Sequence, residues 1–421
     1  MDATPQSGDH TRPIDYEIDK ARTLANTVIL NWLASRLEDD PTADLAQGLK
    51  QQADAYPPFR RRLEQAAQEK ATAQGSDSDS DSDSESENCS GRASPSNAQL
   101  HDFLIEGPVE VTRALDERIM ALVGLTECRP VDANPQNATE LATQINKAIE
   151  NGEVLWRLYG TVVLGLGASV VVKIGTSLDP DDVANLRYIN AHVPDVPAPL
   201  SLGSLKAGRK GYHFMSRADG VTLETLWPDL SVEHKTSIKT QLSSILRALR
   251  KGPQPSPDSR HGGMPRFGGF ISAVCKDTRR QQWVSAPTIH NETQFNDFLC
   301  HKPGRSANAW ITMIRSGMRD DHSLVMTHGD LHPRNIMVQW EGGEEEEGAR
   351  DRGEKKRVRV TALIDWESSG WYPEYWEFVR AVSTINVRGK LSDWFGYLPT
   401  EAMGSWPVEL SIDSFLDRCL G

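Results

Sequence analysis

A short segment in the last third of the chain carries side chains that phosphoryl transfer requires. Asp330 and Asn335 lie in the run THGDLHPRN, and Asp365 lies in the run LIDW after a strand-like segment. Phosphoryl transfer needs a carboxylate that orients the acceptor hydroxyl and oxygen ligands that hold Mg²⁺ against the phosphates. Magnesium keeps several of its waters, so one or two protein oxygens suffice. We therefore expect Asp330 to orient the acceptor and Asn335 and Asp365 to bind Mg²⁺.

A lysine that neutralises phosphate charge is the remaining requirement, and Lys173 is the candidate. It follows three valines in the run VVVK, which is typical of a strand end. A carboxylate on the next helix would hold such a lysine in place, but the helix expected after Asp179 contains no glutamate. Asp182 is the nearest substitute. Its place in the first helical turn is equally explained by the helix dipole, so both interpretations stay open.

The elements that must position Lys173 are strands followed by a helix. Three runs over residues 154–159, 161–166 and 169–174, separated by short glycine-containing turns, predict an antiparallel meander. Asp179 as N-cap and Pro180 at the first helical position predict a helix. Its apolar face is expected to contain Val183, Leu186, Ile189 and Val193. Another strand is expected over residues 212–216, and residues 99–150 are expected to be helical.

The part of the chain after residue 216 has mainly helical patterns, including a helix over 231–251 with Ser231 as its N-cap. Near residue 324 strand patterns return, and 336–340 and 358–364 are expected to form a hairpin. The charged insertion 341–357 between them is expected to be a mobile tip. Pro373 is expected to start a helix whose aromatic residues Tyr375, Trp376 and Phe378 are core. The pattern predicts an α+β, bilobal protein, with a small β-rich N-lobe (99–215) and a larger helical C-lobe (216–421).

Composition limits the class of protein. The chain has 421 residues and a net charge of −13, of which the acidic segment 76–88 and the insertion supply −8. The mildly acidic remainder argues against a nucleic-acid partner. No apolar stretch is long enough for a membrane span, and five scattered cysteines suit a reducing, cytoplasmic compartment. Residues 1–73 are expected to be a helical extension, and the Ser/Asp-rich linker 74–98 is expected to be disordered.

Several of these runs together resemble the aminoglycoside phosphotransferase and choline kinase group, especially its fungal members of unassigned substrate. They are HGDLHPRN, IDW and GWYPEYWE, with VVVK, DVPAPLSLG and YHFMSRADGVTLETLW upstream, so the resemblance covers roughly residues 150–420. It implies a protein-kinase-like fold and ATP or GTP bound at a hinge near Ser216 and Ala218. It also implies that Asp330 is the catalytic base, that Asn335 and Asp365 bind the metal, and that Lys173 contacts the α- and β-phosphates.

Four features of this region allow two interpretations each. There is no GxGxxG, and Gly160 could form the turn over the phosphates or an ordinary hairpin turn. His332 could contact the γ-phosphate or pack within its loop. Glu367, Trp371 and Tyr372 could form an acidic, aromatic pocket for a cationic substrate, whereas the aromatic residues after Pro373 are better explained as the core face of a helix. His328, Asp330 and His332 could also be interpreted as the metal site of a hydrolase, but that interpretation would not explain the positions of Asn335 and Asp365.

The leading hypothesis is a nucleotide- and Mg²⁺-dependent phosphotransferase that acts on a hydroxyl of a small molecule. A peptide substrate is disfavoured because only seven residues separate Asp365 from Pro373, which leaves no room for a long activation segment. The alternative is a catalytically weak or inactive kinase-like protein that serves as a nucleotide-binding or interaction module. The intact set Asp330, Asn335 and Asp365 favours the enzyme, whereas the missing glycine loop and helix glutamate favour the alternative.

Overall fold

The computed structural model divides the chain into two units, Met1–Gly91 and Arg92–Gly421. It describes residues 49, 56–57, 60–61, 100–125, 135–158, 160–176, 178–253, 265–277, 283–285, 288–301, 309–341, 357–385 and 389–420. The few described residues of the first unit are helical, and Arg61 Nε donates to the carbonyl of Pro57. The linker expected over 74–98 and most of the extension expected over 1–73 lie outside the described residues. All candidate site residues belong to the second unit.

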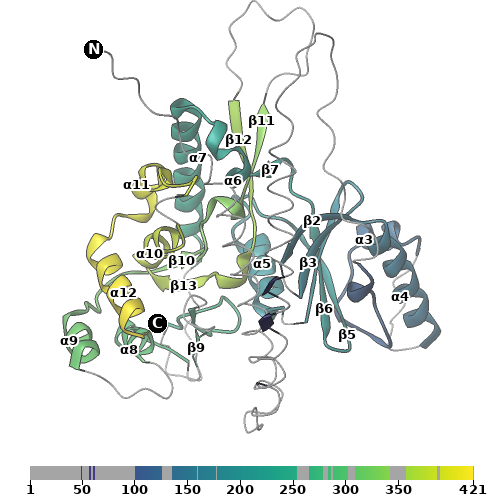
Figure 1. Ribbon diagram of the computed structural model, residues 1–421, viewed down its shortest axis with the longest axis horizontal. Helices are drawn as coiled ribbons and strands as arrows, with labels where there is room; N and C mark the ends of the chain where they lie inside the picture. Colours follow the sequence, from purple (N-terminus) through teal and green to yellow (C-terminus); the bar gives the residue numbers. More distant parts are fainter. Residues whose placement is uncertain are drawn as a thin grey trace, which may run out of the picture. The chain divides into compact units, whose positions relative to one another are not determined.

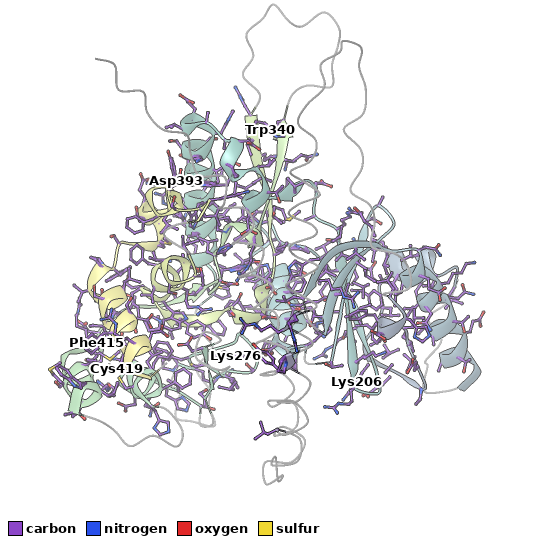
Figure 2. All side chains as sticks on the ribbon, viewed as in Figure 1. Lys206, Lys276, Trp340, Asp393, Phe415 and Cys419 are labelled. Atoms are coloured by element: carbon purple, nitrogen blue, oxygen red, sulfur yellow. The ribbon has the colours of Figure 1, made fainter. Side chains whose placement is uncertain are left out.

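The N-lobe is a six-stranded antiparallel sheet with the order β1-β5-β6-β4-β3-β2 (Figure 1). The strands are β1 (Val109–Arg113), β2 (Glu153–Leu158), β3 (Thr161–Leu166), β4 (Val170–Gly175), β5 (Ser201–Ala207) and β6 (Lys210–Ser216). The predicted meander is confirmed as β2, β3 and β4, and the predicted strand before the hinge is confirmed as β6. Lys206, labelled in Figure 2, is an exposed residue of β5 in the same sheet.

The expectation that residues 99–150 are all helical is wrong at β1. The segment VEVTR alternates β-branched and polar residues, and it pairs as an edge strand with β5. Helices α3 (Glu117–Leu122) and α4 (Pro135–Glu150) form on either side of residues 126–134. Ile145 and Ile149 of α4 pack in the core of the lobe. The region 99–150 therefore contains the predicted helices, but it is not helical throughout.

The alternation of side chains along β4 determines where Lys173 points. Val170, Val172 and Ile174 are buried in the N-lobe core with α4. Lys173 belongs to the opposite face of the strand, where it lies across from His213 of β6. A lysine at this register can therefore reach out of the sheet without entering its core.

Helix α5 (Pro180–His192) connects the two lobes. Its N-cap Asp179 accepts a hydrogen bond from the N–H of Asp181, as predicted. The predicted apolar face of α5 is buried, and Leu186, Ile189 and Val193 pack in the C-lobe core with α7 (Val232–Arg250). Ser231 caps α7 by accepting from the N–H of His234, also as predicted. The packing fixes α5 against the C-lobe.

The C-lobe is mainly helical, with short sheets next to the site. Besides α7, its helices are α6 (Leu223–Leu226), α8 (Glu292–Cys300), α9 (Ala309–Gly317), α10 (Trp376–Ser383), α11 (Thr400–Met403) and α12 (Pro407–Leu420). Its strands are β7 (Val221–Thr222), β8 (Lys276–Asp277), β9 (Trp283–Val284), β10 (Leu324–Thr327), β11 (Ile336–Glu341), β12 (Arg357–Leu363) and β13 (Gly370–Pro373). The predicted β11–β12 hairpin is confirmed, and residues 342–356 between its arms lie outside the described residues. In the described part of the chain, none of the helices combines the length and apolar character needed to cross a membrane.

Pro373 does not start a helix, contrary to the expectation from the sequence. Residues 370–373 form β13, which pairs antiparallel with β10 so that Pro373 lies opposite Leu324. Helix α10 begins three residues later, at Trp376. The expectation of core aromatics is confirmed, because Tyr375, Trp376 and Phe378 are all buried. Pairing between strands that are distant in sequence prevailed over the local helix-start signal.

Candidate active site

The loop between β10 and β11 carries Asp330 and Asn335. Gly329 has a φ of +80°, and a Cβ there would lie 2.4 Å from the carbonyl oxygen of Ser368. A residue with a side chain would therefore be strained and would clash with the segment that follows β12. Ile364 donates its N–H to the carbonyl of Asn335, which brings the ends of β11 and β12 together. The loop and the β12 end thus meet at one place.

Asp330 is partly buried, and one of its carboxylate oxygens has no donor among the described residues. Its Oδ2 accepts hydrogen bonds from Asn335 Nδ2 at 2.8 Å and from Arg334 Nη2 at 2.9 Å. No described residue donates to Oδ1, and the side chain is 13% exposed. Burial favours the protonated acid, but Arg334 more than compensates, so the pKa of Asp330 falls below its usual value. The group is an ionised carboxylate with one oxygen available to a hydroxyl.

Helix α10 holds the backbone of this loop. Glu377, which is 2% exposed, accepts from the N–H of His328 at 2.6 Å and of Gly329 at 3.3 Å. Arg380 Nε donates to the carbonyl of Gly329 at 3.0 Å. Burial raises the pKa of Glu377, and the nearby His328 and its N–H oppose this. Our sequence analysis missed Glu377 and Arg380, although two opposite charges within the apolar run WEFVRAV were a usable signal.

Asp365 lies directly after β12 in a left-handed conformation, with φ of 67° and ψ of 65°. Such a conformation is costly for a non-glycine residue and is found mainly at functional sites. Its Oδ1 lies 3.0 Å from Lys173 Nζ. Asp365 therefore links the end of the C-lobe hairpin with the N-lobe sheet.

Lys173 is surrounded by three carboxylates. Its Nζ lies 3.2 Å from Asp182 Oδ2, 3.0 Å from Asp365 Oδ1 and 3.0 Å from Glu367 Oε2. Burial disfavours the ammonium, but these carboxylates outweigh it and hold the pKa of Lys173 well above its ordinary value. Asp182 therefore contacts the lysine in addition to lying in the first turn of α5.

The carboxylates around Lys173 differ in their protonation. Burial raises the pKa of Asp182, but Lys173 and His213 reverse this and lower it to about 2. Glu367 has its pKa raised to about 7, first by burial and then by the charge of Asp365, against the attraction of Lys173. The physical cause is that one ammonium cannot fully compensate three neighbouring negative charges.

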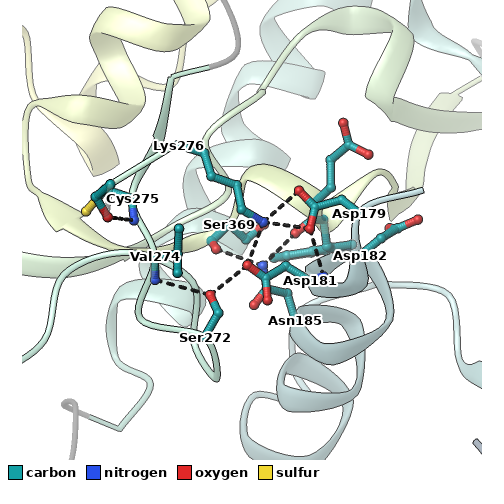
Figure 3. A network of polar contacts seen from close by, with 12 residues as sticks. Asp179, Asp181, Asp182, Asn185, Ser272, Val274, Cys275, Lys276 and Ser369 are labelled. Atoms are coloured by element: carbon teal, nitrogen blue, oxygen red, sulfur yellow. Dashed lines mark hydrogen bonds and ion pairs between the residues drawn. The ribbon is translucent and has the colours of Figure 1, made fainter. Parts of the chain in front are cut away.

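The first turns of α5 are fastened to the C-lobe by a polar network (Figure 3). Lys276 Nζ lies 2.6 Å from both Asp179 Oδ2 and Asp181 Oδ2. One turn later, Asn185 Nδ2 donates to the carbonyls of Ser369 at 2.8 Å and Trp366 at 3.0 Å. These contacts keep Asp182 in place beside Lys173. None of them was predicted, since they join residues that are about 90 to 190 positions apart.

The proposed hinge has backbone groups available for a ligand. Ser216 donates its N–H to Leu200 O at the end of β6. Among the described residues, none forms a hydrogen bond with the backbone of Ala218. Gly160 lies in the turn between β2 and β3, where a Cβ would meet only Thr176 Oγ1 at 3.7 Å. Neither neighbouring backbone nor a positive φ therefore requires glycine at this turn.

Two of the three residues expected in a substrate pocket are core residues. Trp371 is 4% exposed and packs edge-on against Tyr188 and Phe270, and Tyr372 is 1% exposed. Both belong to β13, which lies inside the C-lobe, so we remove them from the candidate pocket. Glu367 contacts Lys173 instead of an aromatic pocket.

His332 has a structural role in the loop. Its Nδ1 accepts from the N–H of Arg334 and so caps the short 3₁₀ helix Pro333–Asn335. Burial, reinforced by Arg334, lowers the pKa of His332 to about 4. A neutral imidazole offers a phosphate no charge, and with Nδ1 accepting a hydrogen bond only its Nε2–H could contact one, so the phosphate contact of His332 stays a prediction. His328 is likewise structural, with its Nε2 3.1 Å from the carbonyl of Ile364.

The oxygen atoms in the site suit a hard cation. Asp182, Asp365 and Glu367 can each offer an oxygen, and these atoms lie within 4.8 Å of one another. Asn335 donates through Nδ2 only, so its Oδ1 is free, and Asp365 Oδ2 has no donor among the described residues. Carboxylate and amide oxygens are the ligands that Mg²⁺ prefers. The donor set therefore fits the metal that the sequence implied.

Comparison with known proteins assigns the chain to a family. The family model described as "Phosphotransferase enzyme family" (APH) matches residues 180–398. A search of curated proteins finds no match. Solved structures with a similar fold include a thermostable mutant of aminoglycoside phosphotransferase APH(4)-Ia with ADP and hygromycin B. It is 15% identical, has a TM-score of 0.38, and the match covers 64% of this chain and 84% of that one.

Another is the GDP complex of wild-type aminoglycoside 2'-phosphotransferase-IIIa. It is 13% identical, has a TM-score of 0.38, and the match covers 64% of this chain and 81% of that one. The family match includes α5, the Asp330 loop, Asp365 and α10, and it spans just over half of the chain. The chain's antiparallel N-lobe sheet and mainly helical C-lobe form the bilobal α+β architecture expected from the sequence, and the chain belongs to the phosphotransferase enzyme (APH) family.

Proposed function

We propose that this protein transfers the γ-phosphate of ATP or GTP to a hydroxyl group of a small molecule, with Mg²⁺ as cofactor. The observation that carries the proposal is the convergence of four groups. Asp330 contacts Asn335 at 2.8 Å and keeps one oxygen without a donor among the described residues. The backbone of Asn335 is bonded to Ile364, the residue before Asp365, and Asp365 Oδ1 lies 3.0 Å from Lys173 Nζ. Phosphoryl transfer needs this combination of a base, metal ligands and a cation.

Each residue then has a distinct role. Asn335 and Asp365 would hold Mg²⁺, which when bound neutralises negative charge on the phosphates. Lys173 reaches Asp365 from β4 and would bind the α- and β-phosphates, with Asp182 and Glu367 holding its ammonium in place. The free backbone of Ala218, next to Ser216, would bind the nucleotide base. Asp330 Oδ1 accepts the proton of the acceptor hydroxyl while Asn335 and Arg334 hold Oδ2.

Nucleotide binding is the first step and can be measured without an acceptor. We expect MgATP or MgGTP to raise the melting temperature of the wild type, because a ligand that binds only the folded state stabilises it. The shift should disappear in Asp365→Asn. Asp393→Asn is the matched control, because Asp393, labelled in Figure 2, pairs with Lys235 far from the loop. No shift with either nucleotide would leave the non-catalytic interaction module as the better hypothesis.

Turnover is a separate measurement. Release of ADP or GDP should depend on Mg²⁺ and on an added hydroxyl compound, and Asp330→Asn should abolish it. Binding without any release over a broad acceptor panel would support a nucleotide-binding module. The cytoplasmic location that the cysteine pattern indicated stays a prediction.

A further inference from the structure

A charged group that phosphoryl transfer does not require lies against the catalytic carboxylate. Arg334 Nη2 donates to Asp330 Oδ2 at 2.9 Å, and the arginine side chain is 49% exposed. A guanidinium has five N–H donors. No other described residue accepts a hydrogen bond from this one. Most of its donors are therefore free and accessible at the place where an acceptor must approach.

The occupied oxygen of Asp330 fixes where the acceptor binds. Oδ2 already accepts from Arg334 and Asn335, so the acceptor hydroxyl must donate to Oδ1. Because both oxygens belong to one carboxylate, substituents next to that hydroxyl come within roughly 4–6 Å of the guanidinium, where charges interact strongly. The negative charge of Asp330 is compensated by Arg334 in their ion pair, and the exposed end of that pair is the guanidinium. A substituent on the guanidinium side is therefore repelled if it is cationic and attracted if it is anionic.

The residues that could have favoured a cationic acceptor are not available. Trp371 and Tyr372 are buried in β13, and Glu367 is bound to Lys173. Asp182 and Asp365 contact the same lysine, and the remaining oxygen of Asp365 is the one assigned above to Mg²⁺. Two arginines lower the pKa of Asp330 through their charge, Arg334 and Arg380. Arg380 is buried, whereas Arg334 is exposed. The geometry next to the acceptor hydroxyl is therefore that of an anion site.

Resting on the proposed phosphotransferase activity, we propose that Arg334 determines acceptor specificity and that the acceptor carries a carboxylate or phosphate next to its reacting hydroxyl. The planar fork of a guanidinium matches the geometry of both anions. In the reaction, the bond from the γ-phosphorus to the nucleoside diphosphate oxygen breaks, and a bond to the acceptor oxygen forms. The hydroxyl proton passes to Asp330 Oδ1.

The charge preference can be tested with compounds that share a carbon skeleton. Glycerate, glycerol and 3-amino-1,2-propanediol form one set, and gluconate, sorbitol and glucamine form another. Binding is measured by saturation-transfer NMR on the full chain with a magnesium complex of a non-hydrolysable ATP analogue, and again without nucleotide. In each set we expect the anion to bind at least tenfold more tightly than the amine. Glycerol 3-phosphate added to the first set distinguishes a phosphate from a carboxylate.

Three variants separate the role of Arg334 from a general effect of charge. Arg334→Gln should reduce the difference between anion and amine to less than about twofold, and Arg334→Glu should reverse it. Arg247→Gln is the matched control, because Arg247 is 48% exposed and pairs with Glu401 on another face. It should leave the preference unchanged.

The outcomes distinguish the two proposals. Amines or neutral polyols that bind as well as the anions would overturn the inference, as would an anion preference that survives in Arg334→Gln. Failure of MgATP and MgGTP to bind the wild type would instead contradict the proposed function, while the NMR measurement without nucleotide still reads the charge preference. Where turnover occurs, Arg334→Gln should lower kcat/KM for the anionic acceptor mainly through KM.

Discussion

Replacement of Lys173 by methionine tests the arrangement of charges in the site. The change keeps an unbranched side chain of similar length and removes the ammonium that lies within 3.2 Å of three carboxylates. Burial raises the pKa of Asp182, but Lys173 and His213 together lower it from 3.8 to about 2, a net change of roughly 2–3 kcal/mol at 1.36 kcal/mol per unit. Removing one member of a buried ion pair costs about 3–5 kcal/mol.

Partial exposure reduces this cost for two of the three partners. Asp365 and Glu367 are about a third exposed, so water and protonation of Glu367 compensate part of the loss. We therefore expect Lys173→Met to lower the free energy of unfolding by about 2–3 kcal/mol. For a folded unit of this size, that corresponds to a fall in Tm of roughly 3–5 °C.

The assay is chemical denaturation with and without divalent cations. Lys206→Met is the matched control, because Lys206 is an exposed lysine of the same sheet (Figure 2) and should change stability by less than about 0.5 kcal/mol. In Lys173→Met the three carboxylate oxygens face one another without a cation. Mg²⁺ or Ca²⁺ should therefore stabilise this variant more than the wild type.

Two results would refute the reasoning on Lys173. One is a Lys173→Met variant as stable as Lys206→Met, because the carboxylates would then not depend on the ammonium. The other is equal stabilisation of variant and wild type by divalent cations, because the three oxygens would then not form a cation site. Restoration of stability by a second change, Glu367→Gln, would support the account.

Three further variants test contacts of the loop and of α5. Glu377→Gln replaces a carboxylate that accepts two backbone N–H groups, so denaturation should show a loss of about 1.5–3 kcal/mol in the free energy of unfolding. Steady-state kinetics should show that turnover falls more than nucleotide affinity, and an unchanged kcat would contradict the positioning role. Gly329→Ala should lower the free energy of unfolding by at least about 2 kcal/mol, because the residue has a positive φ and a Cβ would clash with the carbonyl of Ser368. The same change at Gly160 should lower it by less than about 1 kcal/mol. The ionised Asp182 stabilises the folded state above the unfolded pKa near 4, and this stabilisation is lost as the pH falls toward 2. In urea titrations at pH 5, 4 and 3, the free energy of unfolding should therefore depend less on pH in Asp182→Asn than in the wild type. An equal pH dependence in the two proteins would exclude the ion pair.

Local signals in the sequence predicted the elements that short-range physics determines. The N-cap Asp179, the proline after it and the spacing of Val183, Leu186, Ile189 and Val193 predicted α5. The run of valines before Lys173 predicted β4, whereas the direction of the Lys173 side chain became clear only from the register of β4 with β6. The loop residues Asp330 and Asn335 were predicted together because they are only five positions apart, so their contact depends little on the rest of the fold.

Contacts over long distances in sequence could not be predicted in the same way. Glu367 reaches Lys173 across 194 positions, and its place depends on how α5 and β12 pack. The strand β13 forms because residues 324–327 are there to pair with it, which overrides the proline signal. Arg334 was visible in the sequence, but only the structure shows that its guanidinium takes one oxygen of Asp330 and leaves the other free.

The central claim is that Asp330 performs the transfer whereas Asp365 binds the metal-bound nucleotide. Mg²⁺-dependent hydrolysis of ³²P-labelled ATP or GTP, with water as acceptor, and binding of the same nucleotide can be measured side by side in wild type, Asp330→Asn and Asp365→Asn. The account predicts that Asp330→Asn binds nucleotide normally but transfers phosphate at least 10²-fold more slowly, and that Asp365→Asn loses binding as well. Equal transfer rates in the wild type and Asp330→Asn, or normal Mg²⁺-dependent binding in Asp365→Asn, would contradict it.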